Sequence, residues 1–292
     1  MFVTCTAELM YENERGMGAK LAPFSLFWLQ SCKEDTENII NSEPQSGIDG
    51  EIPISMRLSV RHMALSGFID DVPNMEYHKS TLERVFNPTL SGRLTYRNVA
   101  TAETLSLDVK VDAIPEIVWS DKQARFDIEL TALNPYWIGQ EVREQIALLS
   151  KLFKFPLRIP SKAQGGFVFG RRRLTLDSIF ENVGDVATGF RAVFRARGGT
   201  VAGPMIENKN TGAFVRMRPD LVLQPGDMLE MAIFPNIKRI VLNGSVNAFA
   251  WMDTSSDFFT LPTGTNHLAY SAAENVSNLD VVVYYVPRFL GV

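Results

Sequence analysis

The sequence predicts a mostly β protein, with an N-terminal antiparallel β domain that contains one short helix, followed by a C-terminal β-sandwich. Two observations support this prediction. In the first half, several segments alternate strictly between apolar and polar residues, which is the period of a strand with one buried face. After Arg158, short strand-like segments are separated by turn sequences, a pattern typical of a sandwich or barrel.

Length and composition suit two globular domains. The chain has 292 residues, of which 46% are hydrophobic and 21% charged, and domains commonly hold about 100–200 residues. We expect a first domain over 1–140, a connector over 141–155 and a second domain over 156–292. The net charge of −4 gives no support to nucleic-acid binding, which usually shows as a basic surplus.

Targeting and redox signals are weak. The first residues lack a basic region followed by an apolar one, so we expect no signal peptide. Apolar runs are shorter than the ~20 residues of a membrane helix, so no membrane insertion is expected. The two cysteines, Cys5 and Cys32, have no metal-site or disulfide-framework spacing, which fits a reducing compartment.

The strands of the first domain follow from the alternation. Residues 34–50 are polar and rich in turn formers, so we expect a loop there. Residues 105–111 and 126–132 read as strands with one apolar face, as an antiparallel sheet with a wet side requires. The same pattern predicts a half-buried strand over 52–60, with its apolar face made of Ile52, Ile54, Met56, Leu58 and Val60.

One short helix is expected near 75–87. Ser80 and Glu83 have the spacing of a capping box, and Pro88 disfavours helical geometry at Asn87. Apolar residues at helical spacing give the helix a packing side, formed by Leu82, Val85 and Phe86.

The connector over 141–155 is expected to be helical. Its apolar residues recur at intervals of four, three and four, which indicates a helical stripe, and Pro156 would end it. The stripe consists of Val142, Ile146, Leu149 and Phe153. In the second domain, Asn243-Gly244 predicts a tight hairpin, because both residues tolerate positive φ angles.

A catalytic interpretation of "SSDFFTLPTGTNHLAY" (255–270) does not hold. Ser256, Asp257 and His267 would have to act as a hydrolytic triad, yet no strained G-x-S-x-G turn is present. The competing interpretation is a strand end and a turn, with Phe258, Phe259 and Leu261 buried. No two of the three histidines, His62, His78 and His267, share metal-ligand spacing.

No phosphate-binding glycine motif leads into a helix. We therefore predict no catalytic residues, no cofactor and no metal.

Two residue classes remain as candidates for binding. Arginines on polar strand faces could contact an acidic neighbour, against the simpler interpretation of a solvated face; they are Arg57, Arg61, Arg191, Arg195 and Arg197. Trp119 and Trp251 could stack on sugars, although burial in a core is the commoner fate of tryptophan.

The order of several motifs resembles the distal tail (Dit) proteins of long-tailed, non-contractile phages. In the first half these motifs are "YENERG", "IDGEI", "LERVFNP", "GRLTYRN" and "FDIELTALNPYW". In the second half they are "NVGDVATG", "IENKNTG", "LQPGDMLEM", "VLNGS" and "SSDFFTLPTGTNHLAYSA". Thr263 between Pro262 and Gly264 is a small departure from the family pattern. Together the motifs span nearly the whole chain.

The resemblance implies a structural role and no enzymatic activity. Dit proteins form hexameric rings through their N-terminal domains, between the tail tube protein and the tail-tip hub or baseplate. Their C-terminal domains are galectin-like sandwiches that can carry receptor-binding proteins, and DNA passes through the lumen without specific binding. The expected location is the virion tail tip, assembled in the bacterial cytoplasm. The alternative is a carbohydrate-binding sandwich that contacts the host surface.

Overall fold

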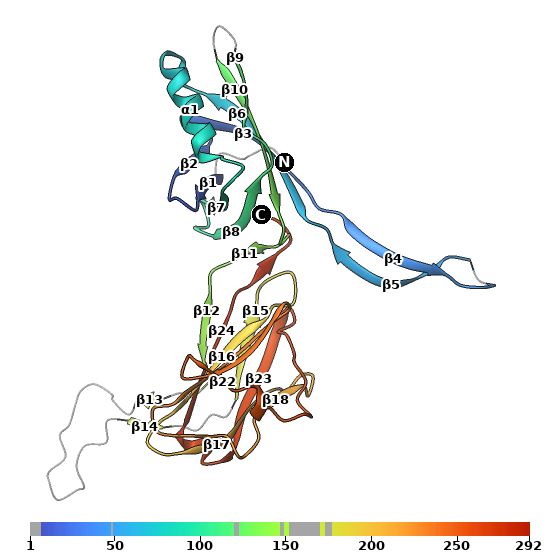
Figure 1. The fold of residues 1–292 in the computed structure, drawn as a ribbon, viewed down its shortest axis with the longest axis vertical. Coiled ribbons are helices and arrows are strands. Elements are labelled where there is room, and N and C mark those ends of the chain that lie inside the picture. Colours follow the sequence, from blue (N-terminus) through green and yellow to red (C-terminus); the bar gives the residue numbers. More distant parts are fainter. Residues whose placement is uncertain (1–6, 48, 120–122, 147–148, 152–169, 173–176) are drawn as a thin grey trace, which may run out of the picture. The chain divides into compact units, whose positions relative to one another are not determined.

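The chain forms two compact units. One comprises Met1–Gln140 and Phe289–Val292, and the other Glu141–Arg288 (Figure 1). The computed structural model describes residues 7–47, 49–119, 123–146, 149–151, 170–172 and 177–292. Within these ranges, no helix has the length and apolar character needed to cross a membrane.

The first unit is a β-barrel with strands added at its ends. A ten-stranded sheet runs in the order β25-β11-β8-β7-β1-β2-β3-β6-β10-β9, and an additional pairing of β8 with β10 closes it. From β11 to β9 along this order, the pairings are antiparallel except β2 with β3, which is parallel. Its strands are β1 (Ala7–Asn13), β2 (Gly18–Ala22), β3 (Phe27–Asp35), β6 (Arg61–Ile69), β7 (Ser91–Asn98), β8 (Thr104–Val111), β9 (Glu116–Trp119), β10 (Ala124–Ala132), β11 (Trp137–Ile138) and β25 (Arg288–Phe289).

Alternation correctly predicts the strands that bury one face in this barrel. The strands expected over 105–111 and 126–132 are β8 and β10. In β10, every second residue from Ala124 to Ala132 is buried. These residues share one apolar core with α1. The apolar face that the alternation predicts is therefore buried by other elements of the same chain.

The one α-helix among the described residues, α1 (Met75–Val85), lies close to the predicted position. A short 3-10 turn, η1 (Val72–Asn74), precedes it. The capping-box prediction is wrong, because Ser80 lies in the middle of the helix. The chain leaves the helix at Phe86, whose ring stacks on Tyr11 with centroids 4.3 Å apart.

The second unit is a sandwich of two sheets around one core. One sheet has the order β12-β24-β16-β20-β21-β22; the other has β15-β23-β17-β18, with β19 added to β17. Both contribute buried side chains to one cluster, such as Phe194 and Val281 from the first and Ile206 and Leu268 from the second. The strands are β12 (Val142–Gln145), β15 (Asp177–Asn182), β16 (Phe190–Ala196), β17 (Val201–Asn208), β18 (Phe214–Arg216), β19 (Val222–Leu223), β20 (Met228–Phe234), β21 (Ile237–Leu242), β22 (Val246–Asn247), β23 (Gly264–Glu274) and β24 (Leu279–Tyr285), with 3-10 turns η3 (Phe249–Trp251) and η4 (Val276–Asn278).

The hairpin predicted at Asn243-Gly244 is confirmed. It joins β21 to β22, and the φ angles of Asn243 and Gly244 are +50° and +74°. Both values lie in the left-handed region that a type I′ turn requires.

The helical connector is wrong where the chain is described. Residues 142–145 are β12, paired with β24, and β13 (Leu149–Lys151) pairs with β14 (Gly170–Arg172). A spacing of four is even, so Val142 and Ile146 share one side of an extended chain as well as one side of a helix. Pairing with β24 and burial of Ile146 favour the strand. Residues 152–155, including Phe153, lie outside the described residues.

Candidate interaction surfaces

The β4–β5 arm, β4 (Asn38–Pro44) and β5 (Glu51–Leu58) with the turn between them, is a ribbon with exposed apolar residues. Among the described strands, β4 and β5 pair only with each other (Figure 1). Ile54 is 62% exposed and Met56 65% exposed, and Ile40, which is opposite Met56, is also exposed. Exposed clusters of large apolar residues mark interaction sites.

The arm corrects two predictions. The strand over 52–60 exists as β5, but residues 51–57 are exposed on both faces, because none of the described residues forms a layer over them. The loop expected over 34–50 contains β4, which forms because its backbone pairs with β5. Arg57 is exposed on the arm, where it remains a predicted partner contact.

Arg61 is buried and bound within the first unit, so its prediction as a partner contact is wrong. Only 4% of the residue is exposed. Its guanidinium pairs with Glu34 and donates to the carbonyl oxygens of Pro135 at 2.7 Å and Leu290 at 2.5 Å. Glu34 also accepts from the Trp137 indole N–H at 3.3 Å. Residues 59–60 separate β5 from β6, and Arg61 falls on the inner side of β6.

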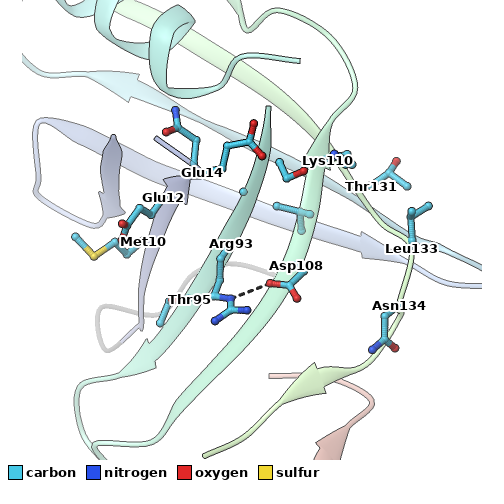
Figure 2. Close-up of a pocket in the computed structure, with 14 residues that line it drawn as sticks. Met10, Glu12, Glu14, Arg93, Thr95, Asp108, Lys110, Thr131, Leu133 and Asn134 are labelled. Carbon is cyan, nitrogen blue, oxygen red and sulfur yellow. Dashed lines mark hydrogen bonds and ion pairs between the residues drawn. The ribbon is translucent and has the colours of Figure 1, made fainter. Parts of the chain in front are cut away.

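A groove of about 660 Å³ lies on the outer side of β1, β7 and β8 (Figure 2). Arg93 and Asp108 form an ion pair across it, with 2.8 Å between Nε and Oδ1. The hydrogen bond that Arg93 donates to Asp108 raises the pKa of Arg93. Exposed Met10 and Leu133 add apolar surface to its lining. Such a mixed lining suits a protein segment.

The predicted arginines of the second unit share the outer face of the six-stranded sheet. Phe190, Ala192 and Phe194 are fully buried, so Arg191 and Arg195, which alternate with them, point away from the core. Arg191 lies over the Tyr284 ring, with Cζ 4.3 Å from its centroid. Arg197 follows the end of β16 and pairs with Asp280 at 2.7 Å.

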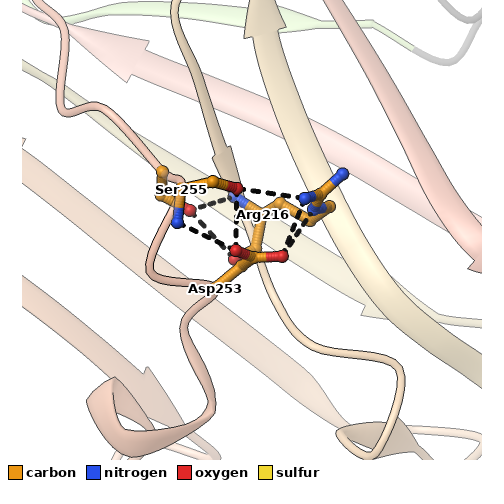
Figure 3. A network of polar contacts seen from close by, with 4 residues as sticks. Arg216, Asp253 and Ser255 are labelled. Carbon is orange, nitrogen blue, oxygen red and sulfur yellow. Dashed lines mark hydrogen bonds and ion pairs between the residues drawn. The ribbon is translucent and has the colours of Figure 1, made fainter.

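The serines of the 255–270 segment take part in turn structure. Arg216 donates from Nε and Nη2 to Asp253 Oδ2 at 3.0 and 2.7 Å, and from Nη2 to Ser255 Oγ at 3.1 Å (Figure 3). The backbone N–H of Ser255 donates to Asp253, which contributes most to lowering the pKa of Asp253 to about 2. Ser256 Oγ accepts from the Arg216 backbone N–H at 3.0 Å.

The proposed triad residues have other partners. His267 Nε2 lies 2.7 Å from Asp177 Oδ2, and Ser256 bonds to the Arg216 backbone. Phe259 and Leu261 are buried as predicted, and Phe258 is half-buried. The Asn266 side chain donates to the carbonyl oxygens of Pro262 and Gly264. The segment therefore folds as a strand end and a turn.

Other polar candidates are dispersed. His78 pairs with Asp71 at 2.8 Å on α1, and His62 lies 2.9 Å from Thr131 Oγ1 on the barrel. Within the described ranges, no three His, Cys, Asp or Glu side chains form a group suited to a metal ion. Burial raises the pKa of the half-buried Cys32 thiol to about 12, so it stays protonated. Cys5 lies outside the described residues.

The two predicted sugar-stacking tryptophans belong to different units. Trp119 is on β9 in the first unit, and Trp251 is in the second, half-buried against its core. Trp119 is 44% exposed, and the carbohydrate-binding alternative stays a prediction.

Sequence reasoning missed the arm. The signal was present, because Ser46-Gly47 and Asp49-Gly50 sit between two strand-like stretches, 38–44 and 51–58. Glycine-containing turns of this kind join hairpin strands.

Comparison with known proteins identifies the second unit. Residues 183–289 match the family model described as siphovirus-type tail component, C-terminal domain. This part of the chain is a Dit-family tail domain. The resemblance to Dit proteins is thereby confirmed over residues 183–289.

The whole chain also has a Dit fold. The crystal structure of Dit from phage SPP1, described as a hub of the adsorption apparatus, aligns with a TM-score of 0.65 at 10% identity, covering 97% of this chain and 99% of that one. A chain of the phage P2 baseplate in its activated conformation aligns with a TM-score of 0.43 at 9% identity, covering 98% and 99%. No curated protein matches. The mostly β fold class is confirmed.

Proposed function

We propose that this Dit protein forms a ring, of six copies as in its family, that joins the tail tube to the tail tip or baseplate. In this role the ring binds the tail tube protein on one side and the tail-tip hub on the other, and anchors receptor-binding proteins. The galectin-like second unit faces these partners, and DNA passes through the lumen without specific contacts. Assembly takes place in the host cytoplasm.

The exposed β4–β5 arm is the observation that carries this proposal. An alternating apolar pattern normally reports a buried face, yet the arm's apolar residues are exposed within one chain. Burial of these residues against a neighbouring copy of the chain is the simplest explanation. If each copy offers one arm and one receiving surface, the contact is heterologous and closes into a ring when the rotation allows.

The groove of Figure 2 supports the same assembly. It lies in the first unit and combines the exposed apolar residues Met10 and Leu133 with the Arg93–Asp108 pair. A receiving surface of this composition matches an arm that carries Ile54 and Met56 together with Arg57.

The test compares oligomeric states of the full chain by light scattering and negative-stain micrographs. Wild type should form rings, and Ile54→Asp/Met56→Asp should be monomeric with an unchanged melting temperature, since both side chains are exposed. The matched control, Tyr77→Asp/Val99→Asp, changes two exposed apolar residues off the arm and should keep the ring. A monomeric wild type at tens of micromolar, or rings from the arm variant, would refute the proposal.

A further inference from the structure

The outer face of the six-stranded sheet carries a row of arginines around a tyrosine. The strand register places Arg143 opposite Tyr284, and Tyr284 opposite Arg191. Arg191 is opposite Ala232, which is opposite Arg239. Neighbouring strands are about 4.8 Å apart, so the row crosses the sheet as one band. We call this surface, with Arg195 and Arg197, the arginine face.

The arginine face is basic in an acidic chain. Its five arginines stand against three carboxylates, Glu141, Glu230 and Asp280, a net charge of +2, whereas the whole chain carries −4. Glu230 is shared between Arg191 at 3.4 Å and Arg239 at 2.7 Å.

The middle of the arginine face is less polar. Val193 and Val282 are directly opposite each other and half-buried. An apolar centre with arginine and tyrosine around it is the composition of protein interfaces.

The other sheet presents the complementary charge. On its outer face, Asp177 and Glu207 flank Ala269, and Glu181 follows on β15. These three carboxylates and Lys209, which pairs with Glu207 at 2.6 Å, leave a net charge of −2. The neighbouring Arg216–Asp253 pair adds no net charge. We call this surface the carboxylate face.

The carboxylate face also has an apolar centre. Ile179, between Asp177 and Glu181 on β15, is 67% exposed. Phe214 on β18 and Met205 on β17 are half-buried. Each face therefore combines apolar surface with charges of one predominant sign.

We propose that the arginine face of one copy docks on the carboxylate face of the next copy. The two faces belong to the two sheets of one sandwich, with the shared core between them, so they point in opposite directions. A contact between opposite sides of identical domains is heterologous, and it repeats around a ring when the rotation between copies closes. The inference rests on the proposed ring and adds a second contact to it, one made by the second unit.

A second copy is favoured as the occupant because the same chain supplies both charge signs. Charge complementarity fixes which partner and which register are selected, and placing like charges together is costly. This contact should weaken as salt screens the charges.

The test uses charge reversal in the full chain, read by mass photometry over a concentration series. Arg191→Glu/Arg239→Glu alters the arginine face, and Asp177→Lys/Glu181→Lys alters the carboxylate face. Each variant should need at least about tenfold more protein to assemble than wild type, because like charges would meet across the contact. In an equal mixture, the reversed arginine face of one variant meets the reversed carboxylate face of the other, and their unchanged faces also have opposite charges. The mixture should therefore assemble within about threefold of wild type.

The controls separate this inference from the ring proposal. Arg15→Glu/Arg218→Glu reverses two arginines in turns outside both faces and should assemble like wild type. Rescue by mixing cannot come from misfolded chains, so it supports the contact. The inference is overturned if each variant alone assembles at the wild-type concentration, or if the mixture needs as much protein as either variant alone. In both cases the ring proposal is still tested separately by the arm variant. A monomeric wild type overturns both, and a requirement for a different acidic protein overturns the second copy as occupant.

Discussion

Replacing Arg61 with methionine should destabilise the first unit strongly. Methionine keeps the apolar stem but removes the guanidinium, which is bound to Glu34 and to the carbonyl oxygens of Pro135 and Leu290. Glu34, whose side chain is 19% exposed, would lose its charged partner. Removing one member of a buried ion pair costs about 3–5 kcal/mol, so we expect that loss in the free energy of unfolding.

Urea unfolding of the full chain measures this loss in the transition of the first unit. Tryptophan fluorescence is a suitable signal, because the buried Trp137 indole donates to Glu34. Arg93→Met is the matched control. Its ion pair with Asp108 is more than 60% exposed at both side chains, and such surface pairs contribute about 0–1 kcal/mol.

A second variant isolates the cause. Arg61→Met/Glu34→Gln removes both charges, so it should recover part of the stability that Arg61→Met loses. If Arg61→Met costs no more than Arg93→Met, the buried pair does not hold the first unit together and the reasoning fails.

Three further changes test other parts of the structure. Gly92→Ala should cost about 1–3 kcal/mol by overpacking, because an added Cβ would lie 2.3–2.4 Å from Tyr11; Gly291→Ala, with nothing within 4 Å, is the control in thermal unfolding. Asp253→Asn should lower the melting temperature above about pH 4, the unfolded-state pKa, and the difference should fade as the pH drops towards 2, through the folded pKa of about 2; a constant difference would contradict it. Phe24→Asn should be neutral or stabilising by up to about 1 kcal/mol, because Phe24 is 74% exposed at φ +59° and asparagine tolerates that geometry; a clear loss in calorimetry would show that its contact with Trp28 outweighs the strain.

The sequence predicted those strands whose apolar face is covered by the same chain. β8 and β10 follow the alternation because the barrel core covers their inner side. β5 has the same pattern but is exposed, because alternation shows that an apolar face exists without showing what covers it. The prediction of its burial failed at this point.

The other incorrect predictions failed because contacts between residues far apart in the sequence determine the structure there. Val142 and Ile146 have a spacing common to helices and strands, and pairing with β24 selects the strand. The partners of Arg61 come from residues 34, 135 and 290, so local sequence could not show that it is internal. Arg191, Arg195 and Arg197 were placed correctly on one face because their alternation with buried Phe190 and Phe194 is local.

The return of the chain to the first unit sets an order for its folding during synthesis. β25 lies next to β11 at one end of the ten-stranded sheet, and Leu290 accepts a hydrogen bond from Arg61. The ribosome produces these residues only after the whole second unit. Domains usually fold in the order of synthesis, but here the sandwich can complete its core while the sheet of the first unit still lacks β25. The arm is thus present on a nascent chain whose first unit is unfinished, and that unit is completed only once translation has passed Leu290.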